Sequence, residues 1–266
     1  MKGKIPADRF LIISLIVSFV FMISPAAGAA GLFGAPQTVS RTEGGLNTAI
    51  GYRYHQDMFE NGSDYKVRQN EIYSQAAYGA NNIWEIYARA GIANMKMVDI
   101  FRSPDYEADT DENNFDENWK VSGTFGAKFF YPMTKTLGMG AFVQGTYCFS
   151  DFTDNVSGTS LGKPFTANLK VKNLWDINFG VGFQATLPCG TRLYAGPYIY
   201  YSEAEMAMSS KISGLEYSTE NFSVKNKTIA GGFAGADIPL IKRFRLNVEA
   251  QYADQFSAGL AVSYTY

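Results

Sequence analysis

The sequence predicts an all-β fold: a transmembrane, antiparallel, up-and-down β-barrel of about ten strands, with eight or twelve strands as alternatives. Three observations support this. The 266 residues include 26 Gly, 15% are aromatic and only 18% are charged, a composition typical of β proteins. Segments of alternating apolar and polar residues follow one another along the chain. The connections between these segments alternate between long and short.

The alternation is clearest in the last segment, residues 255–266. Successive side chains of a strand point to opposite faces. One face of this segment is apolar and holds Phe256, Ala258, Leu260, Val262 and Tyr264. The other is small and mostly polar and holds Ser257, Gly259, Ala261, Ser263 and Thr265. We expect the first face to contact lipid and the second to line the lumen. Because a bare strand edge needs a partner, the segment should pair with residues 46–54 and close a ring.

Ten segments are predicted as strands. They cover residues 46–54, 67–78, 83–93, 119–131, 137–149, 174–187, 191–201, 222–238, 244–252 and 255–266. In the eighth, Gly231 and Gly232 blur the two faces. The connections after the second, fourth, sixth and eighth segments are short, whereas those after the first, third, fifth and seventh are long and polar. Such sorting is typical of membrane barrels, which have short periplasmic turns, longer outer loops and an even number of strands.

The first 29 residues are typical of a secretory signal peptide. Lys2, Lys4 and Arg9 precede an apolar run over 10–23, and small residues follow at 26–30, as at a signal cleavage site. The alternative is a retained membrane anchor, for which the run is short. The sequence therefore predicts a signal peptide over 1–29, a polar leader over 30–45 and a barrel over 46–266.

The signal, the alternating segments, the sorted loops and the closing residues 258–266 resemble a Gram-negative outer-membrane β-barrel protein of the broad OmpA-like and porin-like group. The resemblance implies a location in the cell outer membrane and contact with outer-membrane lipid and lipopolysaccharide. It also implies a C-terminal signal for the barrel assembly machinery, comprising Leu260, Val262, Tyr264 and Tyr266. We expect no peptidoglycan-binding domain after the barrel.

Charged residues of both signs are predicted to point into the lumen as a polar network. They are Arg53, Glu71, Glu85, Arg89, Lys128, Asp176, Arg192, Arg245 and Glu249. A ring of about ten strands is narrow, so the sequence predicts a lumen largely filled by these side chains. Pairing of the second and third segments predicts Glu71 directly or diagonally opposite Arg89, as an ion pair. The alternative is a narrow, porin-like channel for small solutes.

Composition and spacing exclude several other functions. A net charge of −2 and a pI near 5.5 do not suit nucleic-acid binding, which needs a basic face. Residues 99–118 are strongly acidic but lack the spacing of an EF-hand, so a solvated loop is expected, with divalent cations bridging to lipopolysaccharide as the alternative. No metal or cofactor is predicted. Cys148 and Cys189 fall at opposite ends of the expected barrel and should be free thiols.

The candidate for enzymatic chemistry is His55, the one histidine, with Asp57 two residues later. Omptin-like barrel proteases use acidic residues with an Asp–His pair, but here the order is reversed. Lipid A deacylase-like barrels pair His with Ser, and no comparable spacing occurs near His55. The sequence therefore predicts a non-enzymatic barrel with a structural or surface-interaction role. A narrow channel is the second hypothesis and an omptin-like hydrolase the third.

Overall fold

The computed structural model describes residues 32–38, 45–80, 83–98, 100, 114–160, 163–212 and 215–266. Twelve strands occur in this part of the chain. They are β1 (Gly45–Glu60), β2 (Asp64–Ala80), β3 (Trp84–Met97), β4 (Phe115–Pro132), β5 (Leu137–Cys148), β6 (Phe152–Ser160), β7 (Lys163–Thr186), β8 (Arg192–Ile212), β9 (Leu215–Asn226), β10 (Ala230–Ile241), β11 (Phe244–Ala253) and β12 (Gln255–Thr265). The predicted signal peptide lies outside the described residues.

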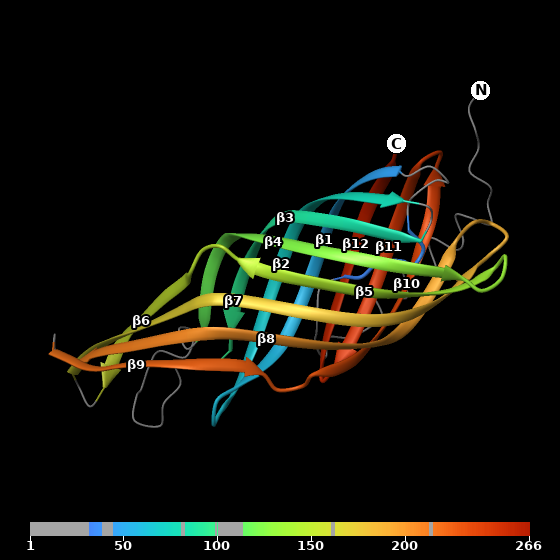
Figure 1. Cartoon of the computed structure of the whole chain (residues 1–266). Helices are drawn as coiled ribbons and strands as arrows, with labels where there is room; N and C mark the ends of the chain where they lie inside the picture. Colours follow the sequence, from blue (N-terminus) through green and yellow to red (C-terminus); the bar gives the residue numbers. More distant parts are fainter. Residues whose placement is uncertain are drawn as a thin grey trace.

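Ten of these strands form a closed antiparallel ring (Figure 1). Its order is β1-β2-β3-β4-β5-β7-β8-β10-β11-β12, and β12 pairs back onto β1 from Asn47↔Thr265 to Tyr54↔Ala258. The prediction of a ten-stranded barrel closed by its first and last strands is confirmed. β12 ends beside the start of β1, with Thr265 opposite Asn47, and we call this end of the barrel, where the C-terminus is marked in Figure 1, the terminal end.

β6 and β9 lie outside the ring and lengthen the sheet at the other end, which we call the distal end (Figure 1). β6 pairs with residues 163–171 of β7, and β9 pairs with residues 203–212 of β8. β7 has 24 residues, so at a rise of about 3.3 Å per residue it is about 80 Å long. A strand crosses a bilayer with only about ten residues. This distal sheet, made of β6, β9 and the paired parts of β7 and β8, is called the extension below.

Several predictions about the strand bounds and the connections are wrong. The expected eighth strand, 222–238, is two strands, β9 and β10, which pair with different parts of β8. The connection after β1 is not long, since only residues 61–63 separate β1 from β2, with Gly62 at φ 71° in the turn. The long connections expected after the fifth and seventh segments are also largely strand, because β6 and the start of β7 occupy the first, and the end of β8 and most of β9 occupy the second. Beyond the membrane the outward side chains are polar, so these strand segments look like loops in the sequence.

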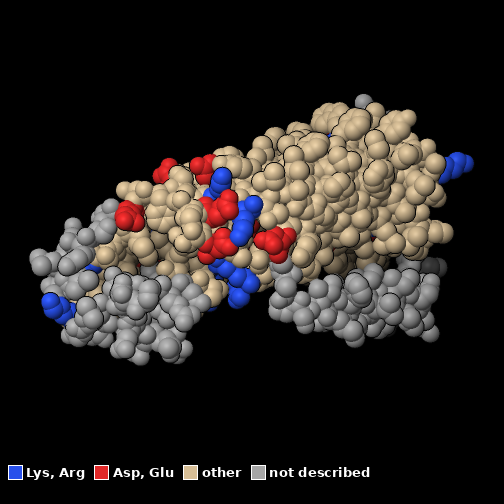
Figure 2. Space-filling model, turned by 90° about the horizontal axis from the view of Figure 1, so that it is seen from below, with Lys and Arg blue, Asp and Glu red and all other residues tan. Residues whose placement is uncertain are grey.

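The outward face of the ring carries a broad apolar belt. Ile50 is 67% exposed, Phe125 64% and Phe183 57%. On β12, Leu260 and Val262 are exposed whereas Ser257 and Ala261 are buried, which confirms the predicted lipid-facing and lumen-facing sides. In Figure 2 the half of the molecule that carries this belt is nearly free of charged side chains. Charged side chains gather instead near the middle of the molecule. A closed ring satisfies its own backbone groups, so an apolar belt of this kind suits a lipid environment.

The described part of the chain contains no helix long and apolar enough to cross a membrane.

Two apolar clusters fill the interior. The lumen cluster consists of Phe33, Ala35, Phe142, Tyr194, Tyr198, Tyr200, Phe233 and Ala253. The extension core lies under the distal sheet and consists of Phe59, Val67, Met95, Met97, Phe115, Cys148, Phe152, Val156, Phe165, Ala167, Leu169, Val171, Leu174, Ala204, Met206 and Val224. The extension therefore packs on a hydrophobic core that it shares with the distal ends of the ring strands.

Candidate functional site: the closed lumen

Residues 32–38, called the strap below, lie inside the barrel. They belong to the segment predicted as a polar leader, and their burial was not predicted. Phe33 is fully buried, and its ring centroid lies 5.0 Å from that of Phe233, 5.3 Å from that of Phe142 and 5.6 Å from that of Tyr198. Aromatic pairs at these separations are favourable beyond the area that they bury. The strap therefore anchors itself in the lumen cluster through one ring.

The backbone of the strap is bound by side chains of the barrel wall. Glu249 Oε1 accepts a hydrogen bond from Phe33 N at 2.9 Å, and Glu249 Oε2 accepts one from Gly34 N at 2.7 Å. Arg89 Nη2 donates to the carbonyl of Leu32 at 2.7 Å. These charge-assisted bonds satisfy backbone groups that would otherwise be buried without partners. Two residues of the predicted polar network thus hold the strap.

The other end of the strap is held by an amide pair. Gln37 N donates to Gln184 Oε1 at 3.0 Å, and Gln184 Nε2 donates to Gln37 Oε1 at 3.1 Å. Wall glycines leave the space that the strap occupies. A Cβ on Gly259 would lie 2.6 Å from Leu32 Cδ1, and one on Gly140 would lie 3.0 Å from Pro36 Cβ. The wall is therefore complementary in shape to the strap.

Arg53 and Glu71 form a buried ion pair in the distal half of the lumen. They face each other across β1 and β2, with Arg53 Nε 3.0 Å from Glu71 Oε2 and each side chain 6% exposed. Ser122 Oγ donates to Glu71 Oε1 at 2.8 Å. Glu71, which was predicted to pair with Arg89 across β2 and β3, therefore pairs with Arg53 across β1 and β2.

The predicted Glu71–Arg89 pair is wrong. Across β2 and β3, Glu71 lies opposite Ala93, and Arg89 lies opposite Gln75. The expected turn, residues 79–82, was placed too early, because the strands stay paired up to Ala80↔Trp84. Arg89 Nε donates to Gln75 Oε1 at 2.7 Å, so an amide occupies the position expected for a carboxylate.

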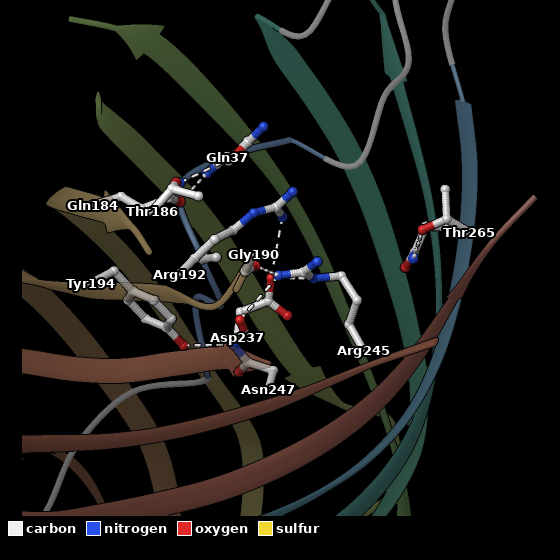
Figure 3. A network of polar contacts seen from close by, with 12 residues as sticks. Gln37, Gln184, Thr186, Gly190, Arg192, Tyr194, Asp237, Arg245, Asn247 and Thr265 are labelled. Atoms are coloured by element: carbon white, nitrogen blue, oxygen red, sulfur yellow. Dashed lines mark hydrogen bonds and ion pairs between the residues drawn. The ribbon is translucent and has the colours of Figure 1, made fainter. Parts of the chain in front are cut away.

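The remaining members of the predicted network are distributed along the lumen. Lys128 Nζ lies 3.6 Å from Glu85 Oε1. Asp176 accepts a hydrogen bond from Asn178. Arg192 and Arg245 converge on Asp237, a residue that sequence reasoning missed (Figure 3). Asp237 lies in the predicted eighth segment, where the paired glycines obscured which side chains point inward.

The extension core closes the distal end. Phe115 and Phe152 are fully buried, and Met206 is 1% exposed. These side chains come from β4, β6 and β8 and meet in one cluster with residues of β1, β2 and β3. The lumen is therefore occupied at two levels, by the strap with its aromatic cluster and by the extension core.

Removing one member of the Arg53–Glu71 pair should destabilise the barrel strongly. Glu71→Leu leaves a buried guanidinium without its counter-charge, which costs about 3–5 kcal/mol. The double variant Arg53→Met with Glu71→Leu should recover most of this loss, because no buried charge remains. Urea unfolding in lipid vesicles, followed by tryptophan fluorescence, measures both. A single variant that unfolds at the same urea concentration as the wild type would contradict the ion pair.

The other candidates from the sequence are placed as follows. His55 Nδ1 lies 3.1 Å from Ser257 Oγ, a contact between β1 and β12 that sequence spacing did not reveal. Ser257 is fully buried, so it offers no approach to a substrate. Asp57 accepts hydrogen bonds from Tyr200 Oη at 2.9 Å and from Met58 N at 2.8 Å. Neither cysteine forms a disulfide, as predicted, and Cys148 is buried whereas Cys189 is exposed.

The acidic segment 99–118 lies mostly outside the described residues. In its described part, Asp116 pairs with Lys96, and Glu117 Oε2 accepts a hydrogen bond from Thr153 N at 2.7 Å. These carboxylates are thus engaged by protein donors. The described residues contain no group of His, Cys, Asp and Glu side chains arranged to hold a metal ion.

No family model and no curated protein matches the sequence. Among solved structures, the translocator domain of the autotransporter NalP from Neisseria meningitidis is similar at 13% identity over 97% of this chain and 95% of that chain, with a TM-score of 0.45. The outer-membrane protease OmpT from Escherichia coli is similar at 11% identity over 87% of this chain and 100% of that chain, with a TM-score of 0.43. The TodX monoaromatic hydrocarbon channel, as a mutant, is similar at 12% identity over 91% of this chain and 72% of that chain, with a TM-score of 0.42.

At this level of similarity the solved structures do not determine a role, and the fold is established by the strand pairing of the chain itself. Ten strands close a ring, the outward face is an apolar belt, and the inward face holds charges, amides and aromatic rings. These features are those of a transmembrane barrel. The chain folds as a transmembrane β-barrel.

Proposed function

We propose that this barrel is a structural outer-membrane protein that displays its extension at the cell surface for interactions and does not conduct solutes. The observation that carries the proposal is the occupied lumen together with the projecting sheet. The strap and the extension core fill the interior at two levels, while β7 and β8 continue well beyond the apolar belt. The long strands therefore form a projecting surface element, whose hydrophobic core is shared with the distal ends of the ring strands.

A narrow channel is the second candidate, because a polar cavity adjoins the strap. The cavities at the two ends of the lumen measure about 70 and 20 Å³. Conduction would require the strap to leave and the extension core to open. Each is fixed by fully buried rings, namely Phe33 in the first case and Phe115 and Phe152 in the second. These rings favour the closed, structural role.

The proposal includes lipid partners. Ion pairs lie on the exposed surface of the distal half, including Lys170–Asp151 at 2.8 Å and Lys227–Asp64 at 2.5 Å. The hydrogen bond to Asp64 raises the pKa of Lys227. Exposed lysines of this kind suit the anionic groups of lipopolysaccharide. We also propose that Leu260, Val262, Tyr264 and Tyr266 serve the barrel assembly machinery during biogenesis.

Removing the extension tests the proposed role. Short Gly-Ser turns would replace residues 152–172 and 204–225, and electrophoresis with and without heating would confirm that the ring still folds. Cells producing the wild type are expected to aggregate and adhere to surfaces more than cells without it, and cells producing this variant should lose that gain. A matched control places a Gly-Ser turn at residues 133–136, at the terminal end. Adhesion and aggregation equal to those of the wild type would contradict the surface role.

A further inference from the structure

A cavity of about 70 Å³ lies between the strap and the terminal end of the barrel. Its charged lining residues are Glu85, Arg89, Lys128, Arg192, Asp237 and Arg245. Four cations thus face two carboxylates, an excess of two positive charges. One water molecule takes about 30 Å³ of liquid volume, so the cavity has room for a small polyatomic ion.

The cations divide into those engaged by the barrel and strap and those that remain available. Arg89 is bonded to Leu32 O and Gln75, and its guanidinium lies 4.9 Å from the ring centroids of Tyr73 and Tyr87. Lys128 is paired with Glu85 at 3.6 Å. The available excess therefore lies with the arginines at the mouth of the cavity.

Arg192 and Arg245 share one acceptor atom. Arg192 Nη1 lies 3.2 Å from Asp237 Oδ2, and Arg245 Nε lies 2.6 Å from the same oxygen. Arg245 Nη2 also donates to Gly190 O at 2.9 Å. Within the described part of the chain, Arg192 makes no hydrogen bond besides the one to Asp237. A guanidinium has five N–H donors, so most donors of Arg192 are left for another acceptor.

The two guanidinium groups lie close together and point into the lumen toward the strap (Figure 3). Their side chains are 16% and 18% exposed, so they are partly withdrawn from water. Like charges this close need a second counter-charge in addition to Asp237. Guanidinium forks match the spacing of oxygen atoms in phosphate and carboxylate groups.

We propose that the Arg192–Arg245 pair is a binding site for a small oxyanion, such as phosphate or a carboxylate, at the terminal end of the lumen. The anion bridges the two guanidinium groups on the side away from Asp237. Gln37 of the strap and Asn247 of β11 also line this cavity, and Asn247 Nδ2 already donates to Tyr194 Oη at 2.7 Å, so the Gln37 amide is the nearer candidate for a further donor. In this site the strap is one wall, so a closed lumen and a bound anion are compatible.

Calorimetric titration of the folded, full mature chain in detergent with sodium phosphate tests this site. At an ionic strength of about 10 mM, where screening is weak, the wild type should show saturable binding. Arg192→Gln should weaken binding about tenfold or more, because it removes charge-assisted bonds. Lys66→Gln, which removes a cation from the outer surface, is the matched control and should bind like the wild type.

Asp237→Asn gives a readout in the opposite direction. It removes the competing carboxylate and leaves both guanidinium groups, so phosphate should bind more tightly than to the wild type. Acetate should compete with phosphate, and chloride at the same ionic strength should not. Absence of saturable binding by the wild type, unchanged binding by Arg192→Gln, or equal competition by chloride would each overturn the proposal.

Discussion

Replacing Phe33 by alanine is expected to release the strap from the lumen. The ring is fully buried and touches three aromatic partners, and removing such a ring costs about 3–5 kcal/mol. The strap is a short segment held by a few side chains, so this loss should fall on its own attachment. The barrel ring, which is paired strand to strand, should stay folded.

Release is measured by labelling a cysteine introduced at position 37. The background carries Cys189→Ser, because Cys189 is exposed and Cys148 is buried. With Gln37→Cys in this background, Phe33→Ala should raise the rate of maleimide labelling about a hundredfold or more. Phe149→Ala is the control, since that ring is 66% exposed. Equal labelling rates with and without Phe33→Ala would show that the ring does not anchor the strap.

Replacing Phe152 by alanine is expected to open the extension while the ring remains intact. Phe152 is fully buried in the extension core, and the substitution should cost about 3–5 kcal/mol. The extension core lies at the distal ends of the strands, away from the paired ring in the apolar belt, so the loss should appear as local opening. Trypsin added to intact cells should then cut near Lys170 of β7 much faster than in the wild type.

This experiment also tests the orientation of the chain. The chain ends of such barrels are expected on the periplasmic side. The extension lies at the opposite end, so cleavage should occur from outside the cell. Phe183→Ala is the control, since that side chain is 57% exposed on the outward face of the ring. If Phe152→Ala resists trypsin in intact cells but is cut after the outer membrane is opened, the extension lies in the periplasm, which would contradict the proposed orientation.

The ring was predictable because its strands carry period-two patterns set by lipid on one side and a packed lumen on the other. Leu260 and Val262 alternate with Ser257 and Ala261, and the structure shows them on the expected faces. The extension was not predictable in the same way. Around Glu203 and Glu205 of β8 the outward positions are charged, so a real strand has the composition of a loop.

The lumen was partly predictable. Alternation correctly placed residues such as Arg53 and Glu249 inside, but it does not give register. The β2–β3 turn was predicted a few residues too early. As a result the predicted partner of Arg89 was a carboxylate, whereas the residue opposite it is Gln75. The strap could not be inferred, because Phe33 is an isolated aromatic residue in an aperiodic segment. A large apolar residue among glycines and prolines was the one available signal.

The closed lumen is tested most directly by single-channel recording in planar bilayers. The full mature barrel, folded and inserted at high copy number, is expected to leave the bilayer at its baseline conductance. The strap and the extension core each block the path. Steady, reproducible openings from the wild-type protein would contradict the closed lumen and favour a narrow channel.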